Sequence, residues 1–265
     1  QNLEVTWDSA QTNSFFFLPL PCALGRQDDF QWACDLRLAQ IQGGANPAKS
    51  SAFEIAVGFI HVASATQATF NRGTGRNSPN LVEFDYFPPA DIIAATVSPV
   101  IVTSSNQFRP SFNYPVELTV NDLFHVALTF SASNQTLATR ITRNGGPFSS
   151  IKDVVLGTNY ADFHVDAISV NSYNDRGDAY GSVLARGTVD NMVVTWPDPP
   201  VIYLAGQWNN QIWQASYAST HGWSYGLERA EQLPGWQRIL VPQGGTGAPL
   251  IFEDCEPPAN GAFYR

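Results

Sequence analysis

Residues 30–38 read FQWACDLRL, and this stretch decides the fold class. Its even positions hold Phe, Trp, Cys, Leu and Leu, whereas Gln, Asp and Arg stand between them. Successive side chains of a β-strand point to opposite faces of a sheet. A repeat of two residues therefore predicts a strand with one face on a core and the other in solvent.

The same alternation recurs along the chain, separated by clusters of turn-forming residues. It is found at residues 53–59, 82–86, 124–130, 137–143, 163–170 and 189–196. Sequences rich in Gly, Asn, Asp and Pro lie between these stretches and predict turns. No stretch of 11 or more residues keeps the apolar spacing of an amphipathic helix. The pattern predicts an all-β protein with long antiparallel strands in two packed sheets.

A domain boundary is predicted at residues 196–200, which read WPDPP. Three prolines in four residues are incompatible with a central strand and form a stiff, extended link. Four of the seven tryptophans follow this segment. We therefore expect a β-sandwich over residues 1–197 and a small C-terminal β domain over residues 198–265, with aromatic side chains as its core.

The composition excludes several classes of protein. Charged residues make up 14% of the 265 residues, against about 25% in an average globular chain, and 44% are hydrophobic, which predicts a folded protein. Two lysines and a net charge of −9 disfavour nucleic acid and anionic membranes as partners. No apolar run reaches the length of a membrane span.

The start of the chain and the cysteines bear on the location of the protein and on its disulfide bonds. Residues 1–7 alternate polar and apolar without a basic or a hydrophobic leader region, which predicts a processed start and a secreted or cell-surface protein. Cys22, Cys34 and Cys255 leave at least one thiol that is either unpaired or paired with a second molecule. Two alternatives remain for the cysteines: a disulfide bridge between Cys22 and Cys34, or three free thiols.

Residues 80–87, NLVEFDYF, resemble the strand Val-Glu-Phe-Asp-x-Phe of legume lectins in the concanavalin A-like lectin/glucanase superfamily. This resemblance implies a jelly-roll sandwich of two antiparallel sheets and a carbohydrate ligand. Residues 225–229, 233–236 and 262–265 are similar to a small β domain that closes many secreted bacterial surface proteins. The second resemblance implies an extracellular location.

Glu83 and Asp85 form a candidate metal site. They are two residues apart on a predicted strand, so both carboxylates share one face, roughly 7 Å apart at their Cα atoms. The legume lectin pattern implies metal and calcium ligands at these positions, although Pro89 and Ala94 stand where that family has Asn and Asp. Asp91 is a possible further ligand in a single calcium site. Solvated acids on a concave face are the alternative.

A candidate ligand-binding segment follows the strand predicted at residues 163–170. Its members are Asn171, Tyr173, Asn174, Asp175 and Asp178, and they lead into a glycine-containing loop. Amide, carboxylate and aromatic side chains suit sugar hydroxyls and pyranose faces. Ordinary turn chemistry of Asn and Asp explains the same residues without any ligand.

The sequence argues against a glucanase mechanism. Glucanases of this superfamily carry Glu-x-Asp-x-x-Glu on one strand, because glycoside hydrolysis requires two carboxyl groups. Position 88 is proline, so the second glutamate is missing. A hydrolase or lyase would have to recruit His125, His164, Asp166 or Asp175 from other strands.

Three functions therefore remain. The first is an extracellular or cell-surface, non-catalytic, lectin-like protein that binds a polysaccharide or glycan. The second is a structural subunit that self-associates through strand edges into a filament, sheath or matrix. The third is a polysaccharide hydrolase or lyase.

Overall fold

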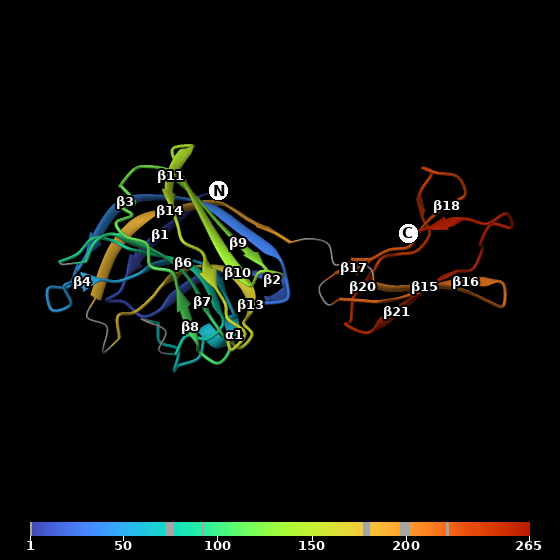
Figure 1. Cartoon of the computed structure of the whole chain (residues 1–265), viewed down its shortest axis with the longest axis horizontal. Helices are drawn as coiled ribbons and strands as arrows, with labels where there is room; N and C mark the ends of the chain where they lie inside the picture. The colour runs from blue at the N-terminus through green and yellow to red at the C-terminus, as the bar shows by residue number, and fades with distance from the viewer. Residues whose placement is uncertain (1, 73–76, 92, 177–180, 197–201, 221–222) are drawn as a thin grey trace. The chain divides into compact units, whose positions relative to one another are not determined.

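A computed structural model describes residues 2–72, 77–91, 93–176, 181–196, 202–220 and 223–265. The chain divides into two compact units, Gln1–Pro197 and Asp198–Arg265, which lie at the bounds expected from the proline-rich segment. Figure 1 shows both units as almost entirely β. Within the described residues, no helix has the length and apolar character that a membrane crossing needs.

The first unit contains an eight-stranded sheet. Its main strand order is β1-β14-β3-β9-β10-β11, while β12 pairs with β10 and β4 with β14. The strands are β1 (Leu3–Asp8), β3 (Phe30–Gly43), β4 (Ser51–Ala52), β9 (Phe124–Ser131), β10 (Thr136–Arg143), β11 (Gly146–Ser150), β12 (Val154–Val155) and β14 (Gly181–Thr195). Apart from the short parallel pair β4–β14, these strands pair antiparallel.

A six-stranded antiparallel sheet forms the second layer, with the order β2-β13-β5-β6-β7-β8. Its strands are β2 (Ser14–Gly25), β5 (Ile55–Ile60), β6 (Leu81–Phe87), β7 (Thr96–Val102), β8 (Phe108–Pro110) and β13 (His164–Ser172). A single turn of helix, α1 (Val62–Ala65), follows β5. The predicted sandwich of two antiparallel sheets is confirmed.

The core lies between the two sheets. Phe30 and Trp32 of β3 contact Phe59 of β5. The ring centroid of Phe59 lies 5.4 Å from that of Phe30 and 6.4 Å from that of Trp32. The alternation in β3 thus places its even positions on the core, as predicted. Phe59 pairs in register with Val82 of β6, so Val82 and Phe84 also face the eight-stranded sheet.

The outer face of the six-stranded sheet is covered as well. All residues of β5 and β7 are buried, which requires a cover on both faces of the sheet. Phe70 supplies part of that cover, since its ring lies 6.1 Å from Phe15 of β2 and 6.0 Å from Tyr173. A second, smaller interior therefore exists on the side of this sheet that faces away from the main core.

The second unit has short antiparallel sheets around an aromatic cluster. Its sheets are β15 (Ile202–Asn209), β16 (Ile212–Ala218) and β21 (Pro249–Asp254); β17 (Ser224–Tyr225) and β20 (Gln243–Gly244); and β18 (Glu228–Ala230), β19 (Gln237–Arg238) and β22 (Phe263–Tyr264). Tyr217, Leu227 and Phe252 are buried together. The rings of Trp213 and Tyr264 stack 3.6 Å apart. Aromatic side chains thus form this core, as the composition predicts.

The three cysteines are free thiols. Cys34 is buried in the main core, Cys22 is half-buried and Cys255 is exposed. Burial raises the pKa of the Cys34 thiol, with the Asp35 carboxylate adding to the shift. The Cys22–Cys34 bridge is therefore not formed in this structure, and of the two alternatives the free thiols apply.

Candidate functional site

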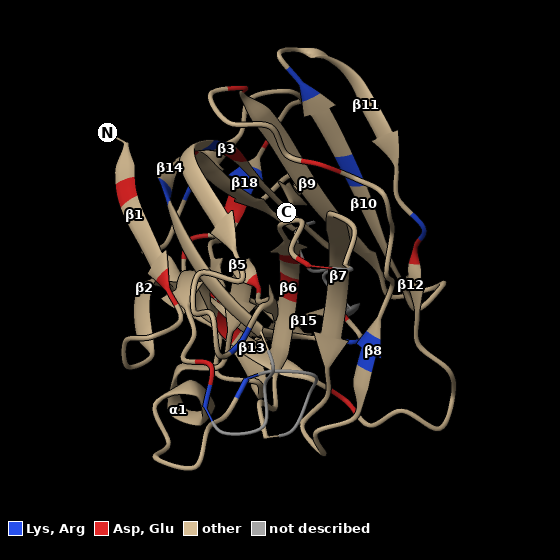
Figure 2. Cartoon of the chain, turned by 90° about the vertical axis from the view of Figure 1, so that its left-hand side faces the viewer, with Lys and Arg blue, Asp and Glu red and all other residues tan. Residues whose placement is uncertain are grey.

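The outer face of the six-stranded sheet holds a buried cluster of three carboxyl groups around one guanidinium. Arg72 Nε lies 3.2 Å from Glu83 Oε2 and 3.9 Å from Glu54 Oε1, and a terminal nitrogen of Arg72 pairs with Asp85 Oδ2. All four side chains are nearly inaccessible to solvent, with at most 2% of each exposed. Figure 2 shows the acidic positions within β6.

β6 and its neighbours position this cluster. Glu83 and Asp85 share one face of β6 because they are two residues apart, as expected. Their register partners in β5 are Gly58 and Ala56, which have no or small side chains. A Cβ at Gly58 would lie 2.3 Å from the carbonyl oxygen of Val82, so glycine is required where β5 approaches β6.

β13 and its extension complete the hydrogen bonds of Glu83. Asn171 Nδ2 donates to Glu83 Oε1 at 2.6 Å, and the Tyr173 hydroxyl donates to the same oxygen. Asn171 Nδ2 also lies 3.0 Å from Ser169 Oγ. Glu83 therefore has protein partners on both oxygens, since Arg72 donates to Oε2.

The electrostatics of the cluster are unbalanced because three carboxyl groups share one cation. Burial raises the pKa of Asp85 well above its ordinary value; Arg72 opposes this effect, while Glu83 and Glu54 reinforce it. Burial likewise raises the pKa of Glu54 against the opposing charge of Arg72. Burial alone would lower the pKa of Arg72, but the three carboxyl groups raise it well above its usual range.

These contacts overturn the expected metal site. Glu83 and Asp85 were expected to face a metal ion or solvent, but the Arg72 guanidinium occupies that side of β6. Asp91 lies apart from them and is 3.4 Å from Ser50 Oγ on the surface. Within the described ranges, no three acidic, histidine or cysteine side chains are grouped to hold a metal ion. The residues do not fit the calcium site, because the buried Arg72 guanidinium contacts both acids and Asp91 does not join them.

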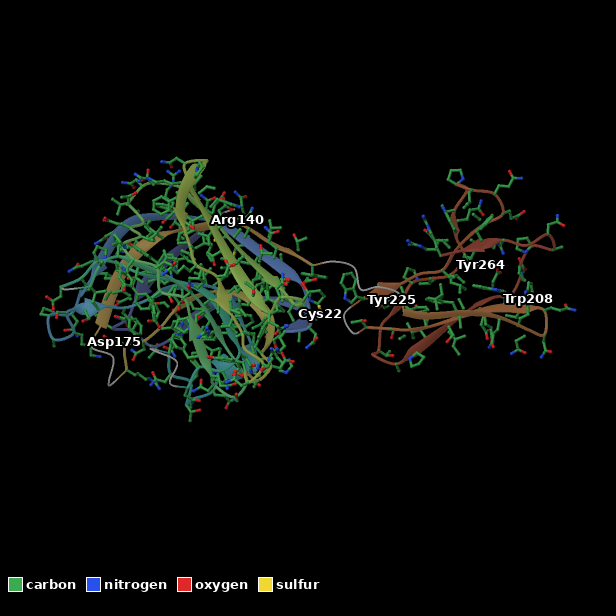
Figure 3. All side chains as sticks on the ribbon, in the orientation of Figure 1. Cys22, Arg140, Asp175, Trp208, Tyr225 and Tyr264 are labelled. Atoms are coloured by element: carbon green, nitrogen blue, oxygen red, sulfur yellow. The ribbon has the colours of Figure 1, made fainter. Side chains whose placement is uncertain are left out.

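The expected ligand-binding segment is also arranged differently. Asn171 and Tyr173 are buried and bind Glu83, so they are not open to a sugar from the loop side. Asn174 donates its backbone N–H to Asn13 Oδ1 at 2.7 Å. Asp175, which is labelled in Figure 3, is buried and pairs with Lys49 Nζ at 2.8 Å. Asp178 lies outside the described residues.

A cavity of about 250 Å³ adjoins the cluster. Arg72, Asp85, Thr96 and Ser98 provide its polar lining. Asp85 Oδ1 is buried and accepts no hydrogen bond in the described part of the chain. Asp85 thus lines the cavity and carries a buried acceptor without a partner among the described residues, an arrangement that costs free energy.

The remaining walls of this cavity are apolar and extend to the surface. Phe87, Ile93, Phe108 and Phe112 line it, and Phe112 is half-exposed. An adjoining hollow of about 290 Å³ shares Ile93, Thr96 and Phe112 and adds Tyr114, whose side chain is 70% exposed. Two connected hollows thus lead from exposed aromatic rings to a buried carboxyl group.

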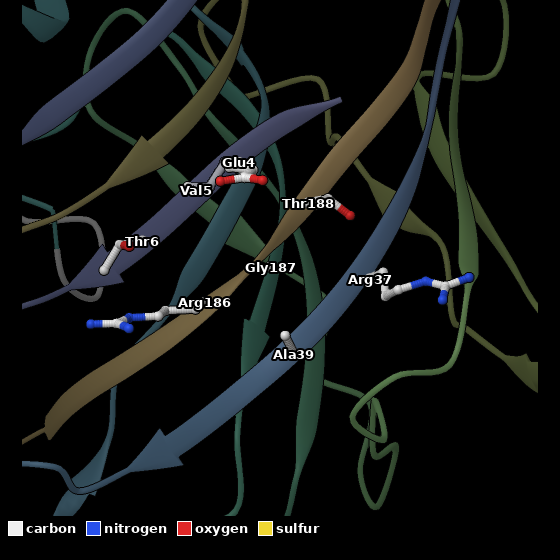
Figure 4. A pocket seen from close by; sticks show the side chains of 8 residues that line it. All are labelled: Glu4, Val5, Thr6, Arg37, Ala39, Arg186, Gly187 and Thr188. Carbon is white, nitrogen blue, oxygen red and sulfur yellow. The ribbon is translucent and has the colours of Figure 1, made fainter. Parts of the chain in front are cut away.

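A third hollow, of about 420 Å³, lies on the outer face of the eight-stranded sheet and is drawn in Figure 4. It exists because Gly187 and Ala39 have little side chain between Glu4, Arg37 and Arg186. Figure 4 shows the two guanidinium groups pointing to opposite sides. The charges do not converge on one point, so this trough is a weaker candidate than the aromatic cavity.

The residues that a hydrolase would recruit lie in separate places. His125 Nδ1 is 2.8 Å from Asp35 on the eight-stranded sheet. Asp166 lies 3.6 Å from His61. Asp175 pairs with Lys49, and the backbone N–H of His164 donates to Asn80 Oδ1. No hydrogen bond or ion pair found among the described residues joins any of these four residues to Glu83.

Sequence reasoning missed Arg72, Glu54 and the aromatic walls. Arg72 lies in a turn-rich segment between β5 and β6, and nothing in its neighbours' spacing indicates burial. One indication was available, because β5 reads IAVGFI and is apolar on both faces. A strand without a polar face predicts a cover on both sides.

No family model matches the chain, and no curated protein matches it in sequence. Solved structures with similar folds include peanut lectin, with 11% identity, a TM-score of 0.44, and coverage of 73% of this chain and 87% of that one. A legume lectin-like domain from Entamoeba histolytica has 8% identity, a TM-score of 0.39, and coverage of 75% and 84%.

A third similar structure is the catalytic domain of a glycoside hydrolase family 131 protein from Coprinopsis cinerea. It has 12% identity and a TM-score of 0.37, and the match covers 76% of this chain and 71% of that one. The first unit itself has an eight-stranded and a six-stranded sheet packed face to face.

Proposed function

We propose that this chain is a non-catalytic carbohydrate-binding protein that acts in the extracellular space or at a cell surface. The observation that carries the proposal is the cavity between β6, β7 and β8. Its outer part presents Phe112 and Tyr114, and its inner part presents Asp85, Ser98 and Thr96. Ligand pockets combine apolar walls with a few placed polar groups in this way.

The size and chemistry of the cavity suit one sugar ring. Its volume of about 250 Å³ lies below the range of about 300–1,000 Å³ typical of pockets for drug-sized ligands. Aromatic rings provide flat apolar surfaces for pyranose faces, while hydroxyl and carboxyl oxygens pair with sugar hydroxyls. The adjoining hollow beside Tyr114 extends the site for a second ring.

The state of the carboxyl groups supports binding without hydrolysis. Glycoside hydrolysis requires two carboxyl groups that flank the scissile bond. Asp85 lines the cavity, but Glu83 is fully buried and bound by Arg72, Asn171 and Tyr173. One carboxyl group at the cavity is compatible with recognition and insufficient for the two-carboxylate mechanism.

Affinity electrophoresis of the full chain through gels that contain single polysaccharides tests this proposal. We expect at least one polysaccharide to retard the protein, and Phe112→Ala to reduce that retardation. Phe16→Ala is the matched control, because Phe16 is also a largely exposed phenylalanine but lies on β2. Absence of retardation by every polysaccharide, or equal loss in both variants, would refute the proposal.

A second candidate function is self-assembly, and one observation favours it. β2 is an edge strand of the six-stranded sheet, and its Phe16, Phe17 and Leu18 are largely exposed. A long apolar edge strand offers unpaired backbone groups to a second copy of the chain. Size-exclusion chromatography over a range of concentrations tests this candidate, and a monomer at all concentrations would remove it.

A further inference from the structure

The cavity beside Asp85 has an excess of negative charge at its buried end. Arg72 contacts Glu54, Glu83 and Asp85. With all three acids ionised, the group would have a net charge of −2 in a region almost closed to solvent. Isolated buried charge is costly, and such groups take up protons instead. The raised pKa values of Asp85 and Glu54 have the same cause.

The charged groups that face Asp85 come from several elements. Glu83 shares its strand β6, Glu54 precedes β5, and Arg72 precedes β6. Tyr173, beyond β13, donates to Glu83 rather than to Asp85. Asp85 Oδ2 is paired with Arg72, while Oδ1 has no hydrogen-bond partner among the described atoms. A ligand in the cavity therefore adjoins a carboxyl group that lacks a full counter-charge.

The rest of the cavity wall favours a cation over an anion. Phe87, Phe108 and Phe112 contribute aromatic rings, and the ring of Phe108 lies 5.9 Å from the Arg72 guanidinium carbon. Aromatic faces attract cations and not anions. A ligand anion would also be repelled by three acidic groups. It would be attracted by one arginine, which already contacts all three acids.

We propose that this cavity selects a sugar that bears a protonated amine, and that the ammonium group pairs with the Asp85 carboxyl group that lines it. This inference rests on the proposed carbohydrate-binding function and names its ligand class. The ammonium group supplies the second positive charge that the cluster lacks. A proton held by the carboxyl groups of the free protein then leaves for solvent when the amino sugar binds.

Isothermal titration of the full chain with three matched oligosaccharides tests the inference: a glucosamine oligomer with free amines, its N-acetylated form, and a glucose oligomer with the same linkage. We expect the free-amine oligomer to bind at least about tenfold more tightly than the other two. Titrations in two buffers of different ionisation enthalpy should show release of about one proton per oligomer bound.

Two substitutions separate this site from general attraction to an acidic protein. Asp85→Asn removes the carboxylate and should abolish both the amine preference and the proton release. Asp91→Asn removes one negative charge from an exposed aspartate, two residues before Ile93 of the cavity wall, and should leave both unchanged. Equal preference in Asp85→Asn and in the unmodified chain would overturn the inference, as would loss of preference in Asp91→Asn.

The outcomes distinguish this inference from the broader function. If the three oligomers bind equally and Phe112→Ala weakens all three, the amine inference fails and the proposed function stands. If no oligomer or polysaccharide binds, both fail. Because Asp85→Asn alters a buried cluster, the fold of this variant is checked by hydrogen exchange. Thr96→Val, which removes a cavity hydroxyl, serves as a second variant. It should weaken the binding of all three oligomers without changing the preference for the free amine.

Discussion

The Arg72→Met substitution removes the guanidinium that three buried carboxyl groups share. Removing one partner of a buried ion pair costs about 3–5 kcal/mol, because the remaining charge stays buried without compensation. The unfolding free energy of a typical domain is about 5–15 kcal/mol. We therefore expect the variant to fold at neutral pH with much of the stability of the first unit lost.

The sign of the pH dependence follows from the carboxyl groups. The pKa values of Asp85 and Glu54 are already raised in the folded protein, and loss of Arg72 raises them further above their unfolded values. A raised folded pKa gives stability that is fully present below the unfolded pKa and is lost as pH rises through the folded pKa. The destabilisation by Arg72→Met should therefore grow with pH, by about 1.4 kcal/mol per pH unit for each additional bound proton.

Hydrogen exchange in increasing urea, followed by mass spectrometry of peptides from β3 and β6, measures the stability of the first unit separately from the second. Between about pH 5 and pH 7, one additional proton would increase the loss by roughly 2–3 kcal/mol. Arg37→Met is the matched control, since Arg37 is exposed on the other sheet. A loss below about 1 kcal/mol, or a loss equal at both pH values, would refute the account of the cluster.

Three further predictions concern stability and reactivity. The unfolding free energy of Asp85→Asn, relative to that of the unmodified chain, should rise with pH from about pH 4 upward, because the variant lacks the carboxyl group whose pKa is raised. Unfolding free energies that vary in parallel with pH in the two proteins, from the same exchange measurement, would contradict this. Phe84→Ala should cost about 3–5 kcal/mol of unfolding free energy, because it leaves a cavity between the sheets, and a urea midpoint close to that of the unmodified chain would count against this core. Reaction with a thiol reagent should label the exposed Cys255 quickly and the buried Cys34 only after unfolding; equal rates in native buffer would be inconsistent with the packing of β3.

Local pattern was sufficient for the strands of the main core. The alternation at residues 30–38 predicts β3, and Phe53 to Phe59 and Val82 to Tyr86 predict β5 and β6, because side chains on a strand must alternate between faces whatever the strand pairs with. The proline-rich segment likewise falls at the division between the two units. These features depend on backbone geometry within a few residues.

The site depended on contacts between distant segments. The spacing of Glu83 and Asp85 shows that they share a face, but it does not show whether that face meets solvent, a metal ion or a basic side chain. The structure brings Arg72 into contact with both acids and with Glu54, and it brings Asn171 and Tyr173 into hydrogen-bonding contact with Glu83.

The sequence by itself determined the two-layer β architecture, the positions of the alternating strands such as β3, β5 and β6, and the aromatic core of the second unit. These features follow from the period of apolar residues and from turn chemistry. Only the tertiary structure decided that the outer face of the six-stranded sheet is covered. Burial of an acid depends on which distant segment folds over it, and the charge of that segment then sets whether the acid is paired, protonated or available to a ligand.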